Sequence, residues 1–265
     1  MGGRVPEPAT DLSELVAAAR ERVPVLVFGS QECSASIERS LLSPQKLAWE
    51  ARLKREIGDE YVMLTSENLA ALHLCIFVRK NLQRRCRAIR AEKVVTGVGN
   101  VIANKGALVI GFQIDQTRLL FVNCHLAAGQ SKVADRNNGV RRIRKELRQL
   151  LNEPKRLDHN TRPVQPYDYV FWFGDLNYRV SGPRDAVFAR LKEGRIDALL
   201  EMDQLTTERR KGHVFGEFDE AGITFLPTYK FDLGAKHYAS VAAQRVPSWT
   251  DRILFKAIKH AHHAV

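Results

Sequence analysis

The sequence predicts a layered α/β sandwich. Short runs of β-branched and aromatic residues alternate along the chain with segments whose apolar residues recur at helical spacing. The chain has 265 residues, of which 45% are apolar, so it can close one sizeable core. No internal repeat or low-complexity tract divides it, and we expect residues 1–265 to form a single domain.

The predicted elements begin with a helix and a strand. Residues 11–22 form the helix, with Asp11 and Glu14 as its N-terminal capping pair. Its apolar face consists of Leu12, Leu15, Val16 and Ala19. Pro24 ends the helix, and residues 25–28 form the first strand.

A second helix and four more strands follow. The helix spans residues 44–57, with Leu47, Leu53 and Ile57 facing inward. The strands are residues 61–65, 71–78, 107–114 and 118–123. Residues 115–117 are few enough to form a hairpin loop between the last two strands.

A third helix, residues 138–151, is amphipathic and basic. Its apolar face consists of Val140, Ile143, Leu147, Leu150 and Leu151, and its other positions carry Arg141, Arg142, Arg144, Lys145 and Arg148. A basic face of this kind is either the solvated side of a core-packed helix or a peripheral contact with anionic lipid. Both interpretations remain open at this point.

Charge and cysteine content limit the partners and the compartment. Lys and Arg number 41 against 30 Asp and Glu, and the resulting charge of +11 favours nucleic acid, anionic membranes or inositol phosphates. The 4 cysteines show no CxxC spacing, which fits a reducing compartment. The apolar runs are far shorter than the roughly 18 residues of a membrane span, and no apolar signal core opens the chain. We therefore expect a cytoplasmic protein.

Two blocks place polar residues at the ends of apolar strands. The strand at residues 167–173 runs into Gly174, Asp175, Leu176 and Asn177. Alone, this pattern is as typical of an Asx turn as of a catalytic site. Residues 245–255 repeat the arrangement, because a charged pair beside Trp249 precedes another apolar strand.

Three further segments complete a set that resembles a known family. They are Asn104–Ala107, Phe121–Ala128 and Phe225–Asp232. In this order the blocks resemble the inositol polyphosphate 5-phosphatases of the endonuclease/exonuclease/phosphatase superfamily, from Gln31 to Leu254. The resemblance implies two packed mixed sheets in a four-layer sandwich with helices outside.

The resemblance also implies the catalytic residues. Glu32 matches a glutamate that binds Mg²⁺, a cation that takes hard oxygen ligands and usually only one or two carboxylates. Asp175 matches the aspartate that orients or deprotonates the attacking water, and Asn177 the amide that holds the phosphate or the water. His125 matches a histidine that bonds the scissile phosphate, and Asp251 an aspartate that orients a later histidine.

Basic residues of the same blocks suit the substrate. Tyr229, Lys230 and Arg245 resemble the clamp for the phosphate next to the one removed, and Lys105 is a further candidate. Arg179 and Arg252 are either additional contacts or structural ion-pair partners.

Parts of the family pattern are not found near the two ends. An Asn-bearing strand is expected before Asp11, and a strand led by Ser-Asp-His after Asp251. His260, His262 and His263 lack the preceding Ser-Asp and are not expected to substitute. The resemblance therefore implies a sandwich incomplete at both ends.

The function implied is a Mg²⁺-dependent phosphatase that removes the 5-phosphate from phosphoinositides or soluble inositol polyphosphates by in-line attack of water. One alternative is a catalytically impaired domain that still binds these headgroups. A nuclease of the same superfamily is less favoured, because it has no need of residues 227–230, and we expect no nucleic acid partner.

Overall fold

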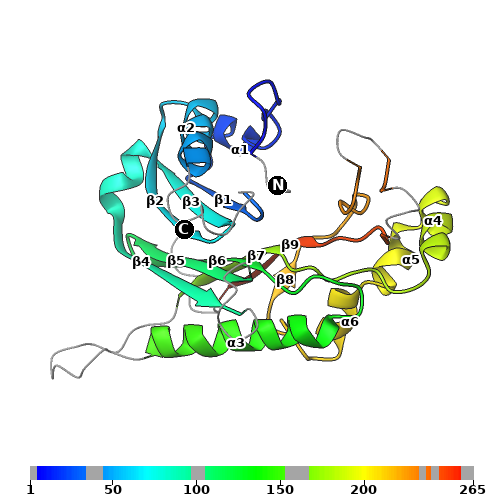
Figure 1. Cartoon of the computed structure of the whole chain (residues 1–265). Coiled ribbons are helices and arrows are strands. Elements are labelled where there is room, and N and C mark those ends of the chain that lie inside the picture. Colours follow the sequence, from blue (N-terminus) through cyan, green and yellow to red (C-terminus); the bar gives the residue numbers. More distant parts are fainter. Residues whose placement is uncertain are drawn as a thin grey trace.

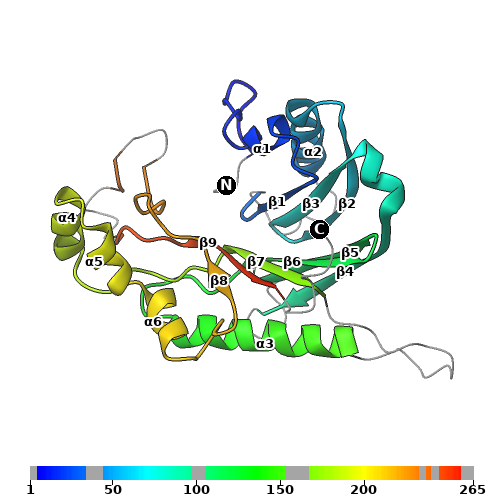
Figure 2. The ribbon, with the colours of Figure 1, turned by 180° about the vertical axis from the view of Figure 1, so that it is seen from behind.

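Two β-sheets pack face to face between outer helices in the computed structural model (Figure 1). The structure describes residues 5–33, 44–96, 105–152, 167–232, 237–239 and 245–257. Helices α1 (Ala17–Arg20) and α2 (Pro44–Ile57) lie outside the first sheet, and α3 (Val133–Asn152) lies outside the second. Figure 2 shows the same order of layers from behind, which is the predicted four-layer sandwich.

The first sheet has three antiparallel strands. They are β1 (Val25–Ser30), β2 (Tyr61–Leu69) and β3 (Leu72–Arg79), in the order β1-β3-β2. On the outer side, Trp49 and Leu53 of α2 pack in one cluster with Phe77 of β3. The sheet therefore gains a helical cover on one face and is free to pack against the second sheet with the other.

The second sheet has six strands in the order β4-β5-β6-β7-β9-β8. Their bounds are β4 (Cys86–Val95), β5 (Gly106–Ile114), β6 (Thr117–His125), β7 (Tyr169–Asp175), β8 (Asp219–Glu220) and β9 (Asp251–Ala257). The central pair β6–β7 is parallel and the other pairs are antiparallel. α3 lies along the outer face and connects the two parallel strands (Figure 1).

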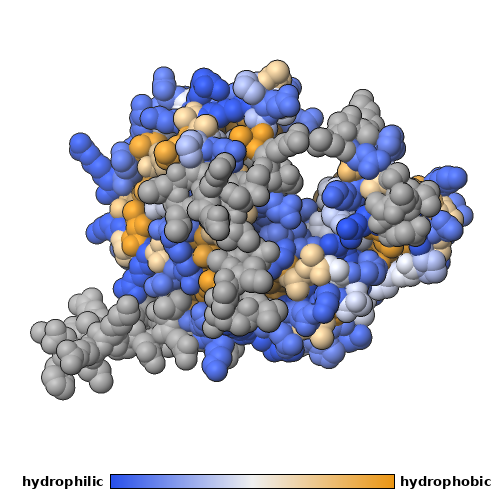
Figure 3. All heavy atoms as spheres, in the orientation of Figure 1, coloured by the Kyte–Doolittle hydropathy of each residue, from blue (hydrophilic) through white to orange (hydrophobic). Residues whose placement is uncertain are grey.

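Apolar residues fill both spaces around the second sheet. Between the sheets, Leu74 and Ile76 of β3 pack in one cluster with Leu108 and Ile110 of β5. On the other face, Ile143 and its neighbours on α3 pack with residues of β5, β6 and β7. Hydrophilic residues cover most of the face seen in Figure 3. No described helix is long and apolar enough to cross a membrane.

The predicted first helix is wrong in length. Only Ala17–Arg20 is helical, although Leu12, Val16 and Ala19 are buried as expected. The Asp11 carboxylate accepts bonds from the backbone N (2.8 Å) and the hydroxyl (3.0 Å) of Ser13, so it stabilises a local turn instead of capping a helix with Glu14. The predicted inward Leu15 is half exposed.

The second helix has the predicted bounds, Pro44–Ile57, but one inward residue is wrong. Leu53 and Ile57 are buried, whereas Leu47 is 60% exposed. The buried side instead includes Lys46 and Trp49, and Leu53 and Ile57 follow them at intervals of four residues. Lys46 can lie inward because its ammonium donates to the backbone oxygen of Ala70 at 2.6 Å.

Several elements have no clear signal in the sequence. β4 lies at the edge of the second sheet, and its mostly exposed residues show no alternation of polar and apolar side chains. The short helices α4 (Arg184–Lys192), α5 (Ile196–Glu201) and α6 (Gln204–Arg210), and the 3₁₀ helix Lys80–Arg85, are also additional. The predicted hairpin is present, with Ile114 paired to Thr117.

Candidate active site

Strand register places three predicted site residues side by side. His125 is the last residue of β6, Asp175 the last of β7 and Asp251 the first of β9. His125 pairs with Asp175 in the parallel ladder, and Asp175 pairs with Asp251 in the antiparallel one. Because Gly106 pairs with His125, Lys105 enters the same edge from β5.

One cavity of about 460 Å³ lies at this edge of the sheet. All nine predicted site residues line it: Glu32, Lys105, His125, Asp175, Asn177, Tyr229, Lys230, Arg245 and Asp251. Glu32 follows β1 of the first sheet, so the cavity has walls from both sheets and from the loops before β9. The roles of the individual residues stay predictions.

Gly174 allows the backbone turn that presents Asp175. Its φ is +115°, and a Cβ at this position would lie 2.3 Å from the Cys124 carbonyl oxygen and 2.7 Å from Asn123 Oδ1. The strand continues through this glycine to Asp175, two residues beyond the predicted end at residue 173. Asp175 Oδ1 then accepts the backbone N–H of Asn177 at 2.9 Å. The Asx-type turn is therefore present inside the cavity-lining segment, and the two interpretations of this motif are compatible.

The amide of Asn177 is fixed on both sides. Its Nδ2 donates to the Leu126 carbonyl oxygen at 3.0 Å, and its Oδ1 accepts from Arg179 Nη2 at 2.5 Å. These two bonds assign the orientation of the amide and leave one N–H of Nδ2 for a further acceptor. Arg179 also places its guanidinium 4.2 Å from the centre of the Tyr229 ring.

His125 lies between a carboxylate and an ammonium. Its Nε2 is 3.3 Å from Asp175 Oδ2 and is also in hydrogen-bond contact with Lys105 Nζ. Burial lowers the pKa of Lys105, although the negative charges of Asp175 and Glu32 oppose this shift. Lys105 is therefore held in the cavity beside His125, with two carboxylates nearby.

Asp251 has an unfavourable environment for a charge. The surrounding protein raises the pKa of Asp251 by reducing the hydration of its charged form, and the adjacent negative charge of Asp175 raises it further. Thr250 Oγ1 donates to Asp251 Oδ2 at 3.0 Å and favours the ionised form. His260, His262 and His263, which we do not expect to replace the family's histidine, lie outside the described residues.

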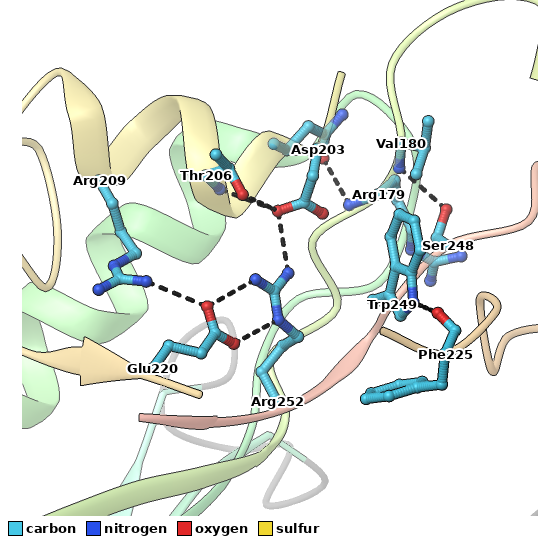
Figure 4. Close-up of polar contacts among 11 residues, drawn as sticks. Arg179, Val180, Asp203, Thr206, Arg209, Glu220, Phe225, Ser248, Trp249 and Arg252 are labelled. Atoms are coloured by element: carbon cyan, nitrogen blue, oxygen red, sulfur yellow. Dashed lines mark hydrogen bonds and ion pairs between the residues drawn. The ribbon is translucent and has the colours of Figure 1, made fainter. Parts of the chain in front are cut away.

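A short backbone bridge positions the predicted clamp. Tyr229 and Ser248 exchange two backbone bonds of 3.0 and 2.9 Å, which join residues 227–231 to the segment before β9. Lys230 and Arg245 are exposed at the mouth of the cavity, and Tyr229 is half-buried. Trp249 is fully buried, and its Nε1 donates to the Phe225 carbonyl oxygen at 3.1 Å, which holds this loop in place (Figure 4).

The structure separates Arg179 from Arg252. Arg252 does not line the cavity, and its guanidinium lies between Asp203, at 2.9 Å, and Glu220, at 2.6 Å (Figure 4). It is a structural ion-pair partner. Arg179 is a lining residue of the cavity that the sequence left undecided.

A buried chain of amides supports the Glu32 side of the site, and the sequence patterns assign no role to its members. Gln31 Nε2 donates to Asn123 Oδ1 at 2.5 Å, and Asn123 Nδ2 donates to the His73 carbonyl oxygen at 3.0 Å. Asn123 is fully buried within β6. The available signal was that Gln31 and Asn123 both fall within the segments that carry the family resemblance.

The donor set of the cavity suits a hard divalent cation. Glu32 and Asp175 provide carboxylates from two walls, and Gln31 lines the cavity beside Glu32. Within the described residues no group of three His, Cys, Asp or Glu forms a dedicated cage. This arrangement fits Mg²⁺, which keeps waters and substrate oxygens among its ligands, better than a four-ligand zinc site.

The comparisons with known proteins agree with this geometry. The model of the Endonuclease/Exonuclease/phosphatase family 2 matches residues 4–265. A phosphatidylinositol polyphosphate 5-phosphatase type IV from Rattus norvegicus is 40% identical over 79% of this chain and 33% of its own length. An inositol-1,4,5-trisphosphate 5-phosphatase 1 from Schizosaccharomyces pombe is 34% identical over 91% of this chain and 23% of its own length.

A solved structure has the same fold. It is the inositol polyphosphate 5-phosphatase domain of SPsynaptojanin in complex with inositol (1,4)-bisphosphate and calcium ion, with a TM-score of 0.74 and 34% identity over 88% of this chain and 67% of that chain. The present chain spans a third or less of the length of the two curated relatives. It belongs to the endonuclease/exonuclease/phosphatase family 2, as a domain of the inositol polyphosphate 5-phosphatase type.

Proposed function

We propose that this chain removes the 5-phosphate from phosphoinositides or soluble inositol polyphosphates in a reaction that depends on Mg²⁺. The observation that carries the proposal is the convergence of Glu32, His125, Asp175 and Asn177 with a basic clamp in one cavity. Relatives named for lipid and for soluble substrates support both substrate classes. The bisphosphate in the related domain carries no 5-phosphate, as a product would.

Glu32 is the residue that we assign to the cation, with Gln31 beside it. When bound, Mg²⁺ supplies positive charge that stabilises the phosphoryl oxygens and the leaving oxygen. On the opposite side, Lys105 and His125 provide donors for the oxygens of the same phosphate. The negative charge that grows during transfer is then countered from both walls of the cavity.

Asp175 is placed to act on the attacking water. Asp175 lines the cavity; its Oδ1 accepts the Asn177 backbone N–H, and its Oδ2 lies 3.3 Å from His125 Nε2. Water would attack phosphorus as the bond to the inositol oxygen breaks, and Asp175 would orient the water and accept its proton. Asn177, fixed by Leu126 and Arg179, directs its remaining amide N–H at the phosphate or at the water.

The direct test is phosphate release from 4,5-bisphosphorylated headgroups, as a soluble inositol phosphate and in lipid vesicles, with Mg²⁺ or with a chelator. We expect release that requires Mg²⁺, and we expect Asp175→Asn to slow it by about 10²–10⁴-fold. Asp168→Asn is the matched control, because Asp168 precedes the same strand and accepts the backbone N–H of Arg118 at 2.7 Å, outside the cavity.

The outcomes separate the alternatives. Binding of both headgroups without release in Mg²⁺ would favour a domain that only binds inositol phosphates. Release from only one of the two substrates would decide between the lipid and the soluble class. Equal rates for Asp175→Asn and the unchanged protein would remove Asp175 from the mechanism.

A further inference from the structure

Arg179 is a nearly buried charge on the wall of the cavity. The residue is 5% exposed and lines the cavity, yet it forms no ion pair with any carboxylate of the described residues. Burying a charge is costly unless an opposite charge or sufficient hydrogen bonds compensate it. The free protein therefore holds a guanidinium whose compensation is incomplete.

Arg252 shows what a compensated arginine looks like in the same region. It is 4% exposed, close to the value for Arg179, and it bonds Asp203 at 2.9 Å and Glu220 at 2.6 and 2.8 Å (Figure 4). Two carboxylates thus surround an arginine that lies outside the cavity. The difference between Arg179 and Arg252 lies in their counter-ions and not in the depth of burial.

Arg136 shows the other structural solution. It is fully buried, and its Nη atoms donate to the carbonyl oxygens of Ala127 and Gly129 and to Gln204 Oε1 at 3.1, 2.7 and 2.6 Å. Burial lowers its pKa to about 10. Arg136 has oxygen acceptors on both Nη groups and does not line the cavity.

Hydrogen bonds fix the Arg179 guanidinium but do not use all of its N–H donors. Its Nε and Nη2 donate to the backbone oxygen and Oδ1 of Asn177 at 3.0 and 2.5 Å, and its plane lies over Tyr229. Its Nη1 makes no hydrogen bond with any described residue. The planar group is thus fixed by two partners while one donor pair stays available, which is the preorganised state of an anion-binding arginine.

We propose that Arg179 is a substrate-binding residue, whose guanidinium takes a phosphate of the inositol ring as the counter-ion that the described protein does not provide. This inference rests on the proposed function, and it assigns Arg179 a place between two predicted subsites. Arg179 bonds Asn177, which is predicted to hold the phosphate that is removed, and stacks on Tyr229, which is predicted to hold its neighbour. It therefore adds a fixed cation between these two predicted subsites.

The test is calorimetric binding of inositol (1,4)-bisphosphate and of inorganic phosphate, in Mg²⁺, to the unchanged protein, Arg179→Gln and Arg179→Lys. Glutamine keeps a donor for Asn177 but removes the charge. We expect it to weaken the binding of both anions by about 10–100-fold, as for a lost charge-assisted bond. Lysine keeps the charge without the planar fork, and we expect a smaller loss.

Arg252→Gln is the matched control. It leaves Asp203 without its ion-pair partner and Glu220 with Arg209 alone, so we expect a lower melting temperature but unchanged anion affinity of the folded protein. Affinities within about twofold of the unchanged protein for both Arg179 variants would overturn the proposal. A failure of the unchanged protein to bind both anions would also overturn it. Binding of inorganic phosphate that is sensitive to Arg179, without binding of the bisphosphate, would keep the anion site and reject the proposed substrate class.

Discussion

Gly174 is a tight structural constraint next to the site, and Gly174→Ala tests it. The substitution places a methyl group 2.3 Å from the Cys124 carbonyl oxygen, 2.7 Å from Asn123 Oδ1 and 2.9 Å from Gln31 Nε2, at a φ of +115°. The left-handed backbone conformation costs about 1–3 kcal/mol for a residue other than glycine. The overlap with a backbone oxygen and two fixed amides adds about 1–3 kcal/mol.

The free energy of unfolding should therefore fall by about 2–6 kcal/mol, with a central value near 4 kcal/mol. For a chain of this size we expect the melting temperature to fall by about 8–16 °C. The folded fraction should also lose activity by about 10²-fold, because relief of the overlap moves Asp175 relative to His125. Thermal unfolding and phosphate release, each normalised to folded protein, measure the two effects.

Gly58→Ala is the control for the backbone conformation alone. Gly58 has a φ of +84°, and its added Cβ would meet nothing within 4 Å. We expect a loss of about 1–2 kcal/mol and unchanged activity. If Gly174→Ala and Gly58→Ala lower stability equally and both remain active, the close packing around Gly174 does not position Asp175, and this reasoning is refuted.

Three further predictions concern the clamp, the paired carboxylates and the corrected helix face. Lys230→Ala should weaken binding of 4,5-bisphosphorylated ligands by about 1.5–3 kcal/mol and of ligands without the 4-phosphate by less, and calorimetry that shows equal losses would remove Lys230 from the clamp. The pKa of Asp251 is raised in the folded protein, so its ionised carboxyl lowers stability once the pH exceeds the ordinary carboxyl pKa of about 3.9. Asp251→Asn should therefore raise the melting temperature at pH 7 and lose this advantage below about pH 4, and an equal difference at both pH values would contradict the assignment. Leu53→Ala should lower the free energy of unfolding, measured in urea, by about 2–5 kcal/mol, and Leu47→Ala by less than about 0.5 kcal/mol, because their exposed fractions are 0% and 60%. The reverse order would mean that Leu47 faces inward, as the periodicity predicts.

Local patterns in the sequence determined most of the central elements. β1, β3, β5, β6 and β7 follow runs of apolar and β-branched residues, and α2 has the bounds that its spacing and its initial proline predict. These elements are buried on one or both faces, so the hydrophobic pattern is itself the physical cause of their position. The resemblance of the motif blocks then named a set of residues that all line one cavity.

The tertiary structure decided whatever depends on partners distant in the sequence. Arg179 and Arg252 each follow a predicted site residue closely and looked equivalent, but Asp203 and Glu220 neutralise only Arg252. β4 forms because β5 offers it a hydrogen-bonding edge, although its own side chains carry no strand pattern. The Asp11 turn likewise prevailed over helical periodicity through a bond to Ser13.

The site itself shows the same division. The sequence indicated that His125, Asp175 and Asp251 stand at strand ends, because apolar runs stop there. Only the ladders β6–β7 and β7–β9 made them neighbours, since register is a property of paired backbones and not of one strand. Burial is the main cause of the raised pKa of Asp251, and the pairing adds to it by setting the charge of Asp175 beside this carboxyl.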